Sequence, residues 1–315
     1  MAAAFVFPGQ GSQSVGMGKA LYEAFPAARA VFEEVDEALG ERLSVLIFEG
    51  PLDRLTLTAN VQPALMAVSL AALRALHAET GFEAARDARF VAGHSLGEYS
   101  ALAAAGALSV ADTARLLRAR GEAMQKAVPV GEGAMAALIG LELDEAREVA
   151  AAAAGDEVCE AANDNGGGQV VVSGHKAAVE RAVEIARERG ARRAMLLPVS
   201  APFHCALMAP AAAVMAERLA AVTVAAPRPL LVGNVTARPS ADPAEITHSL
   251  VQQVTGLVRW RECVAHMAAE GVTRFCEVGA GRVLSGLVKR IAASAAAQAV
   301  GTPEDIRAFG TARAA

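Results

Sequence analysis

The chain has 315 residues, a formal net charge of −5 and a mean hydropathy of +0.33. Hydrophobic residues make up 54% of it, enough to bury a large core, while aromatic residues make up only 4%. At roughly 150 residues per domain, this length suggests two structural units. The acidic balance, without any run of five Lys or Arg, argues against nucleic-acid binding.

Cysteine spacing and the first residues bear on the compartment. The four cysteines, at positions 159, 205, 263 and 276, form no Cys-x-x-Cys pair, which argues against a zinc site and favours a reduced, cytoplasmic setting. The N-terminal residues lack the basic region of a signal peptide, and Pro8-Gly9 interrupts their apolar run. We identify no apolar stretch of 18 residues and therefore expect no membrane-spanning segment.

Strand-like and helical patterns alternate over the first 128 residues. Apolar runs predict strands at residues 4–7 and 89–93, the first of which ends at Pro8-Gly9. Helical spacing predicts four helices, which are residues 19–39 with an interruption near Pro26, residues 62–77 with Pro63 in the first turn, residues 95–105, and residues 112–128.

The middle of the chain has a different pattern. Its predicted elements are strand 133–141, helix 144–154, strand 158–162, a turn over 163–168, strand 169–173, helix 176–190 and strand 193–199. This β-α-β-β-α-β order is that of a ferredoxin-like unit, and the Asn/Gly-rich turn is typical of a hairpin. We therefore expect residues 129–196 to form an inserted ferredoxin-like subdomain.

The remaining segments return to the first pattern. They predict a helix over 208–222, a strand over 229–234, a helix over 245–253, another helix before Gly271 and a strand over 273–278, followed by an Ala-rich and partly loose tail beyond Ile291. Strands that alternate with helices on both sides of an insert indicate an α/β core with a mostly parallel sheet. We assign this core to residues 1–128 and 197–315.

The stretch Gly93-His94-Ser95-Leu96-Gly97 lies between an expected strand and an expected helix. In that context Gly-x-Ser-x-Gly is typical of a nucleophile elbow, whose glycines allow a tight turn that exposes the serine. The N–H of Leu96, at the helix N-terminus, is the natural first donor to an oxyanion. The alternative is that the glycines close a turn and Ser95 only caps the helix.

A nucleophilic serine needs a general base within hydrogen-bonding reach. Of the six histidines, His204 follows the strand expected to end at Val199, where open α/β sheets form their sites. His94 adjoins the serine in the turn, where packing is the better interpretation. A satisfied structural histidine is the alternative for His204.

An orienting carboxylate for His204 is missing from the pattern. The aspartates between Ser95 and His204 fall at helix starts or in the insert, at positions 112, 144, 156 and 164. We therefore expect a Ser-His dyad steered by a backbone or amide oxygen. This argues against an ordinary hydrolase.

Several spaced motifs together carry a family resemblance over residues 4 to about 292. They are Phe7-Pro8-Gly9-Gln10-Gly11-Ser12-Gln13, Gly93-His94-Ser95-Leu96-Gly97-Glu98-Tyr99, Arg120-Gly121 with Met124-Gln125, Val199-Ser200-Ala201-Pro202-Phe203-His204, Gly279-x-Gly281 and Gly286-Leu287. This set closely resembles the malonyl-CoA:acyl-carrier-protein transacylases of bacterial type II fatty-acid synthesis. The resemblance implies an α/β-hydrolase-like core with a ferredoxin-like insert. Gly167 and Ala280 depart from it, standing where the family often has proline.

The resemblance also implies residue roles. Ser95 would take the malonyl group as an ester, with His204 as base and then acid. Gln10 N–H would join Leu96 N–H in the oxyanion hole, and the backbone oxygen of Gln253 would steer His204. Arg120 would pair with the malonyl carboxylate, since a guanidinium can hold a carboxylate by two parallel bonds. Without the resemblance, Arg120 is interpreted as a solvated helix residue.

Phe203, directly before His204, is bulky enough to disfavour an α-methyl branch on the acyl group, although simple packing explains it nearly as well.

The expected substrates are malonyl-CoA and acyl carrier protein, with no cofactor or metal, and the protein is expected to be a monomer. Basic surface around Arg189, Arg192 and Arg193, or around Lys289 and Arg290, could meet an acidic carrier. The alternatives are a loading acyltransferase of a polyketide pathway and a serine acyl hydrolase.

Overall fold

A computed structural model describes residues 2–314. The main sheet has six strands in the order β10-β9-β1-β2-β7-β8, and all neighbours are parallel except β7 and β8. The strands are β1 (Ala2–Phe7), β2 (Phe90–Gly93), β7 (Leu230–Val232), β8 (Pro239–Ser240), β9 (Val272–Val278) and β10 (Ala296–Val300). The expected mixed α/β fold with a mostly parallel sheet is confirmed.

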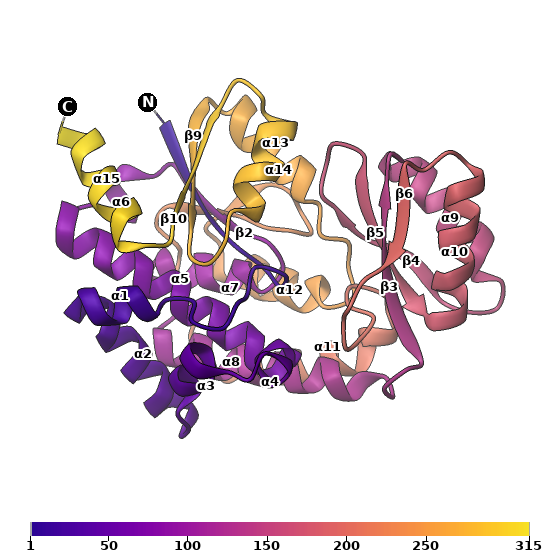
Figure 1. The fold of residues 1–315 in the computed structure, drawn as a ribbon, viewed down its shortest axis with the longest axis horizontal. Helices are drawn as coiled ribbons and strands as arrows, with labels where there is room; N and C mark the ends of the chain where they lie inside the picture. Colours follow the sequence, from indigo (N-terminus) through magenta and orange to yellow (C-terminus); the bar gives the residue numbers. More distant parts are fainter. Residues whose placement is uncertain (1, 315) are drawn as a thin grey trace.

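Helices cover both faces of this sheet (Figure 1). They are α1 (Lys19–Ala24), α2 (Pro26–Leu39), α3 (Leu43–Glu49), α4 (Leu52–Thr56), α5 (Thr58–Thr80), α6 (Ala84–Asp87), α7 (Gly97–Ala104), α8 (Val110–Ala127), η1 (Ala206–Met208), α11 (Ala209–Ala220), α12 (Pro243–Gln253), α13 (Trp260–Ala269), α14 (Val283–Ile291) and α15 (Pro303–Ala314). In β1, Phe5 and Phe7 pack on the side of α5, while Ala4 and Val6 pack on the side of α13 and α14. Burial of both faces explains why β1 is apolar at every position rather than at alternate ones.

A second sheet is built by the middle of the chain. Its antiparallel strands have the order β4-β5-β3-β6 and are β3 (Gly133–Ile139), β4 (Cys159–Asp164), β5 (Gln169–His175) and β6 (Arg193–Leu196). Helices α9 (Leu143–Ala154) and α10 (Lys176–Glu188) pack on it around a separate apolar cluster. Figure 1 shows this unit at one end of the molecule and both chain termini at the other.

The long helix α5 corrects one expectation and bears on a second. It begins at Thr58, so Pro63 lies inside the helix and not in its first turn. With 23 residues and a window of mean hydropathy 1.3, α5 is also long and apolar enough to cross a bilayer by length and composition alone, a test that, from the sequence, we expected no segment to pass. In the folded protein 83% of that window is buried, as in the central helix of a globular core.

The C-terminal tail was predicted wrongly. Residues after Ile291 are not loose within the described range, because β10 adds an edge strand parallel to β9 and α15 follows it. Val300 is 1% exposed and Ile306 is fully buried, so two apolar side chains anchor this segment. The short helices α3 and α4 were also missed; they are too short for helical periodicity to be distinctive.

Candidate active site

Ser95 lies in the turn between β2 and α7. Its φ is 53°, the left-handed region that a residue with a side chain seldom adopts. A Cβ on Gly93 would lie 1.9 Å from the carbonyl of Gly97, and a Cβ on Gly97 would lie 2.2 Å from the carbonyl oxygen of Phe7. Both positions of the motif therefore require glycine, because the backbones approach too closely for any side chain.

The Ser95 hydroxyl faces His204, which follows β6 in a loop. Ser95 Oγ lies 2.7 Å from His204 Nε2, and His204 Nδ1 lies 2.8 Å from the backbone oxygen of Gln253 at the end of α12. A carbonyl oxygen only accepts, so Nδ1 carries the proton and Nε2 accepts the Ser95 hydrogen. This is the tautomer that a general base for Ser95 needs.

Burial holds the imidazole neutral. His204 is 4% exposed. Burial, reinforced by the positive charge of Arg120, lowers the pKa of His204 to about 3. The ring therefore remains free to take a proton throughout the neutral range.

Arg120 from α8 lies beside the nucleophile and is 1% exposed. Its Nη2 donates to Ser95 Oγ at 3.2 Å and to Gln253 Oε1 at 2.8 Å, and its Nη1 donates to Gln62 Oε1 at 2.7 Å. These acceptors are all neutral, and no carboxylate within residues 2–314 comes within ion-pair distance of the guanidinium. Burial lowers the pKa of Arg120, because it removes water from around the charged guanidinium. A buried cation without an anionic contact is suited to an anionic ligand.

These groups line a cavity of about 520 Å³ between the two sheets. Its lining residues are Gln10, Gly11, Gln13, Leu52, Thr56, Gln62, His94, Ser95, Leu96, Arg120, Met124, Met135, Asn163, Leu197, Pro198, Val199, Phe203 and His204. The main body supplies the nucleophile, while Met135, Asn163 and Leu197 come from the smaller sheet or its edge. Phe203 is 7% exposed and forms part of the apolar wall.

Two backbone N–H groups at this cavity remain available. Within residues 2–314, neither Gln10 N nor Leu96 N donates a hydrogen bond to the protein. Leu96 precedes the first turn of α7, where N–H groups have no helical partner. Gln10 follows β1, which pairs with β2 so that Phe7 lies opposite Gly93. The topology thus brings two unpaired donors to the carboxyl ends of neighbouring strands.

His94 lines the cavity, but its hydrogen bond is to the turn after β4 and not to Ser95. Its Nε2 lies 2.8 Å from Asn165 Oδ1, and its ring lies 5.7 Å from that of Trp260. It therefore joins the turn after β4 to the core, which agrees with the packing interpretation.

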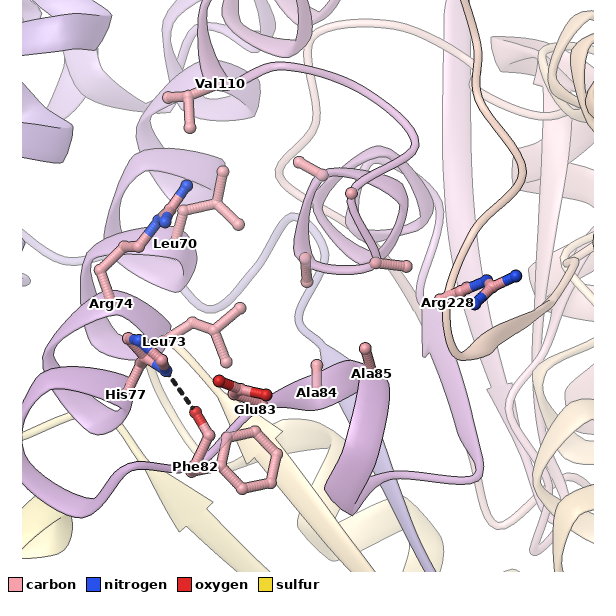
Figure 2. A pocket seen from close by; sticks show the side chains of 14 residues that line it. Leu70, Leu73, Arg74, His77, Phe82, Glu83, Ala84, Ala85, Val110 and Arg228 are labelled. Atoms are coloured by element: carbon pink, nitrogen blue, oxygen red, sulfur yellow. Dashed lines mark hydrogen bonds between the residues drawn. The ribbon is translucent and has the colours of Figure 1, made fainter.

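A separate cavity of about 360 Å³ lies at the other end of α7. Figure 2 shows Arg74 and His77 on α5, with Glu83 nearby and Arg228 on the opposite side. His77 Nδ1 bonds the Phe82 carbonyl oxygen at 2.8 Å, and none of the described residues that line the cavity is a serine or cysteine. Its described lining therefore offers no hydroxyl or thiol nucleophile comparable to Ser95. No group of three metal-ligating side chains is gathered within residues 2–314.

Sequence reasoning missed a polar network beneath Ser95. Asn234, after β7, accepts from Ser95 N through Oδ1 at 2.7 Å and donates through Nδ2 to Gly93 O at 2.7 Å. Glu98 Oε2 accepts from Asn234 N at 3.0 Å and from Gln253 Nε2 at 2.8 Å. Glu98 belongs to the motif quoted above, but the sequence pattern does not reveal that this glutamate is buried in the first turn of α7.

Comparison with known proteins identifies the family. The family described as "Acyl transferase domain" matches residues 4–307. The malonyl CoA-acyl carrier protein transacylase of Bacillus subtilis (strain 168) is 48% identical over 309 residues, covering 96% of this chain and 94% of its own.

Two solved structures are similar over almost the whole chain. The acyl-carrier-protein S-malonyltransferase of Bartonella henselae superposes with a TM-score of 0.97 at 57% identity and covers both chains completely. A malonyl-transacylase in complex with its type II PKS acyl-carrier protein superposes with a TM-score of 0.95 at 40% identity, covering 99% of this chain and 100% of its own. The chain therefore belongs to the acyl transferase family, among the relatives of the bacterial malonyl CoA-acyl carrier protein transacylases.

Proposed function

We propose that this protein transfers the malonyl group of malonyl-CoA to the phosphopantetheine thiol of an acyl carrier protein through an ester on Ser95, in fatty-acid biosynthesis. One observation carries the choice of acyl group. Arg120 is buried without a carboxylate contact, and its Nη2 lies 3.2 Å from the Ser95 hydroxyl. A malonyl thioester offers the carboxylate that this cation lacks, two carbons from the carbonyl that Ser95 attacks.

The first half-reaction acylates Ser95. The hydroxyl oxygen attacks the thioester carbonyl while His204 Nε2 takes the hydroxyl proton, and the Gln253 carbonyl stabilises the resulting imidazolium through Nδ1–H. Gln10 N–H and Leu96 N–H receive the oxyanion, and each such donor contributes about 3 kcal/mol in comparable sites. The tetrahedral intermediate collapses, and His204 returns its proton to the departing CoA thiolate.

The second half-reaction reverses these roles. The carrier thiol gives its proton to His204 and attacks the Ser95 ester, and the Ser95 alkoxide recovers the proton when the intermediate collapses. The kinetics are therefore ping-pong. Both steps exchange acyl groups between oxygen and sulfur, so the proposal requires no cofactor and no metal.

Arg120 would orient the acyl chain as well as select it. By holding the carboxylate, Arg120 would position the thioester carbonyl over Ser95. The bound acyl group would then occupy space in the cavity that water could otherwise fill. Phe203 in the wall would restrict branching at the α-carbon. A serine acyl hydrolase would share the Ser-His pair, but hydrolysis of an uncharged acyl group would not account for the buried arginine beside it.

The carrier protein must reach this cavity from the surface. Arg192, Arg193 and Lys289 are exposed, whereas Arg189 pairs with Glu148 at 3.0 Å and Arg290 donates to Gln169 Oε1 at 3.1 Å. The first three are therefore the better candidates for contact with an acidic carrier. A loading role in a polyketide pathway is the second candidate, because the structural relative in complex with a carrier has a type II PKS partner.

We further assign the domain boundaries. Residues 1–128 and 197–315 would form an α/β-hydrolase-like core and residues 129–196 a ferredoxin-like insert, and the β-α-β-β-α-β order of β3 to β6 supports the latter. We propose that the protein acts as a monomer in the cytoplasm.

A product assay tests the proposed function. With malonyl-CoA and phosphopantetheinylated acyl carrier protein, the expected product is malonyl-carrier thioester, with little free malonate. Release of malonate at the same rate without carrier would assign a hydrolase instead.

A further inference from the structure

Glu98 is a carboxyl group in an unusual place. It lies three residues after Ser95, in the first turn of α7, and is 1% exposed. The groups that donate to it, Asn234 N and Gln253 Nε2, are both neutral. Burying a carboxylate with neutral partners is costly, and the catalytic steps above do not use this group.

One carboxylate oxygen of Glu98 accepts hydrogen bonds from Asn234 and Gln253, the two residues whose side chains bond the backbone of Ser95. Oε2 accepts from Asn234 and from Gln253. Asn234 Oδ1 accepts from the N–H of Ser95 at 2.7 Å, and Gln253 Nε2 donates to the Ser95 carbonyl oxygen at 3.0 Å. Since the left-handed φ of Ser95 is strained, it depends on such neighbours to persist.

The same contacts fix which way the Gln253 amide points. Its nitrogen faces three acceptors, Glu98 Oε2, Ser95 O and, at 3.4 Å, Asn234 Oδ1, and its oxygen accepts from Arg120 Nη2 at 2.8 Å. Turned over, the amide would bring oxygen to the acceptors and N–H groups to the guanidinium. An ionised carboxylate only accepts and therefore opposes the reversed amide, whereas a protonated carboxyl can donate and removes this one of the conflicts, leaving those at Ser95 O and Arg120.

We propose that Glu98, as a carboxylate, is a positioning residue that fixes Asn234 and the Gln253 amide and thereby holds Ser95 and Arg120 in their reactive arrangement. This inference rests on the proposed function, because it assigns Glu98 to the acylation of Ser95. Glu98 touches neither substrate nor a reacting atom, and it acts through its two neighbours.

Among the charged and titratable groups that surround it, Glu98 is the one whose pKa lies near neutral pH. Arg120 on α8, Tyr99 on α7 and Cys263 on α13 act on it electrostatically. Burial raises the pKa of Glu98 to about 7 and that of Tyr99 to about 12, and it also raises the pKa of the Cys263 thiol. Arg120 remains a cation, as arginines in proteins do. His204, which Glu98 reaches through Gln253, keeps its pKa near 3 and stays neutral.

The test is the single-turnover rate of Ser95 acylation by malonyl-CoA, measured by quenched-flow intact mass from pH about 5.5 to 8.5. The wild-type rate is expected to rise about tenfold with a midpoint near 7, as Glu98 ionises. The acylation rate of Glu98→Gln should not change with pH and should equal the wild-type rate at low pH. Its melting temperature at pH about 8.5 should not be lower than that of the wild type. Glu304→Gln, the same change at a carboxylate whose side chain is 79% exposed, should match the wild type.

Three outcomes would overturn the inference. They are a wild-type profile without a step, a step that persists in Glu98→Gln, and a Glu98→Gln rate equal to that of the wild type at pH about 8. If Glu98→Gln does not fold, the inference is judged by whether the wild-type acylation rate shows the step with a midpoint near pH 7. Failure of the wild type to acylate at any pH would instead reject the proposed function, so the two failures are distinguishable.

Discussion

The hydroxyl oxygen of Ser95 lies 2.7 Å from Nε2 of His204, and both residues have a left-handed backbone, with φ of 53° and 61°. Each such residue costs about 1–3 kcal/mol and persists only because contacts with its surroundings offset that cost. Here Ser95 is held by Asn234 and Gln253, and the His204 ring is held by the Gln253 carbonyl. Gln253 therefore links both halves of the dyad.

Replacing His204 by Ala should lower the acylation rate about 10³-fold or more, because Ser95 loses its proton acceptor while the cavity and the oxyanion donors remain. His204 has a pKa near 3, so its own protonation should not limit the wild-type rate above pH about 5. Quenched-flow acylation measures both effects. A variant with near wild-type rates would assign another base.

Arg120→Ala should reduce malonyl transfer about 100-fold or more, since a charge-assisted carboxylate contact contributes roughly 3 kcal/mol when buried. Acetyl transfer, which has no carboxylate to lose, should fall much less. The measurement is kcat/KM for malonyl-CoA and acetyl-CoA in parallel. Arg115→Ala, on the same helix with a side chain 59% exposed, is the control and should change neither value. Equal losses for the two substrates in Arg120→Ala would remove it from carboxylate recognition.

Phe203→Ala should enlarge the apolar wall of the cavity beside the nucleophile. We expect the ratio of methylmalonyl to malonyl acylation to rise about tenfold, since a methyl group in a tight pocket contributes roughly 1–3 kcal/mol of discrimination. Competition between the two thioesters, read by intact mass, measures the ratio. An unchanged ratio would leave Phe203 with a packing role alone.

Gly97→Ala should destabilise the protein by more than about 3 kcal/mol, because the new Cβ would lie 2.2 Å from the Phe7 carbonyl oxygen. Gly286→Ala is a matched control inside α14, where no described atom outside its own stretch of helix lies within 4 Å of the added Cβ, and it should stabilise by up to about 1 kcal/mol. Denaturant unfolding compares the two. Similar behaviour of both variants would show that the elbow tolerates a side chain.

The sequence was most informative where a local pattern determines the structure. Gly93 and Gly97 flank Ser95 in a motif that specifies the turn, whereas Arg120 on α8 was singled out by the family resemblance and not by helical spacing. The alternating pattern also predicted β3 to β6 in order, including the hairpin between β4 and β5.

It was least informative where structure depends on distant contacts. The edge strand β10 forms because β9 is available to pair with it, which the Ala-rich composition of the tail does not reveal. Similarly, Asn234 and Glu98 are 136 positions apart in the sequence and meet only in the folded core. A lone motif glutamate therefore gave no sign of its role beneath the nucleophile.

Intact-mass analysis after incubation with malonyl-CoA tests the covalent role of Ser95 most directly. The account predicts a single malonyl adduct on the wild type that disappears when phosphopantetheinylated acyl carrier protein is added. It predicts no adduct on Ser95→Ala, because among the described residues that line the cavity no other side chain is hydrogen-bonded to His204. A malonyl adduct of the same stoichiometry on Ser95→Ala would contradict it.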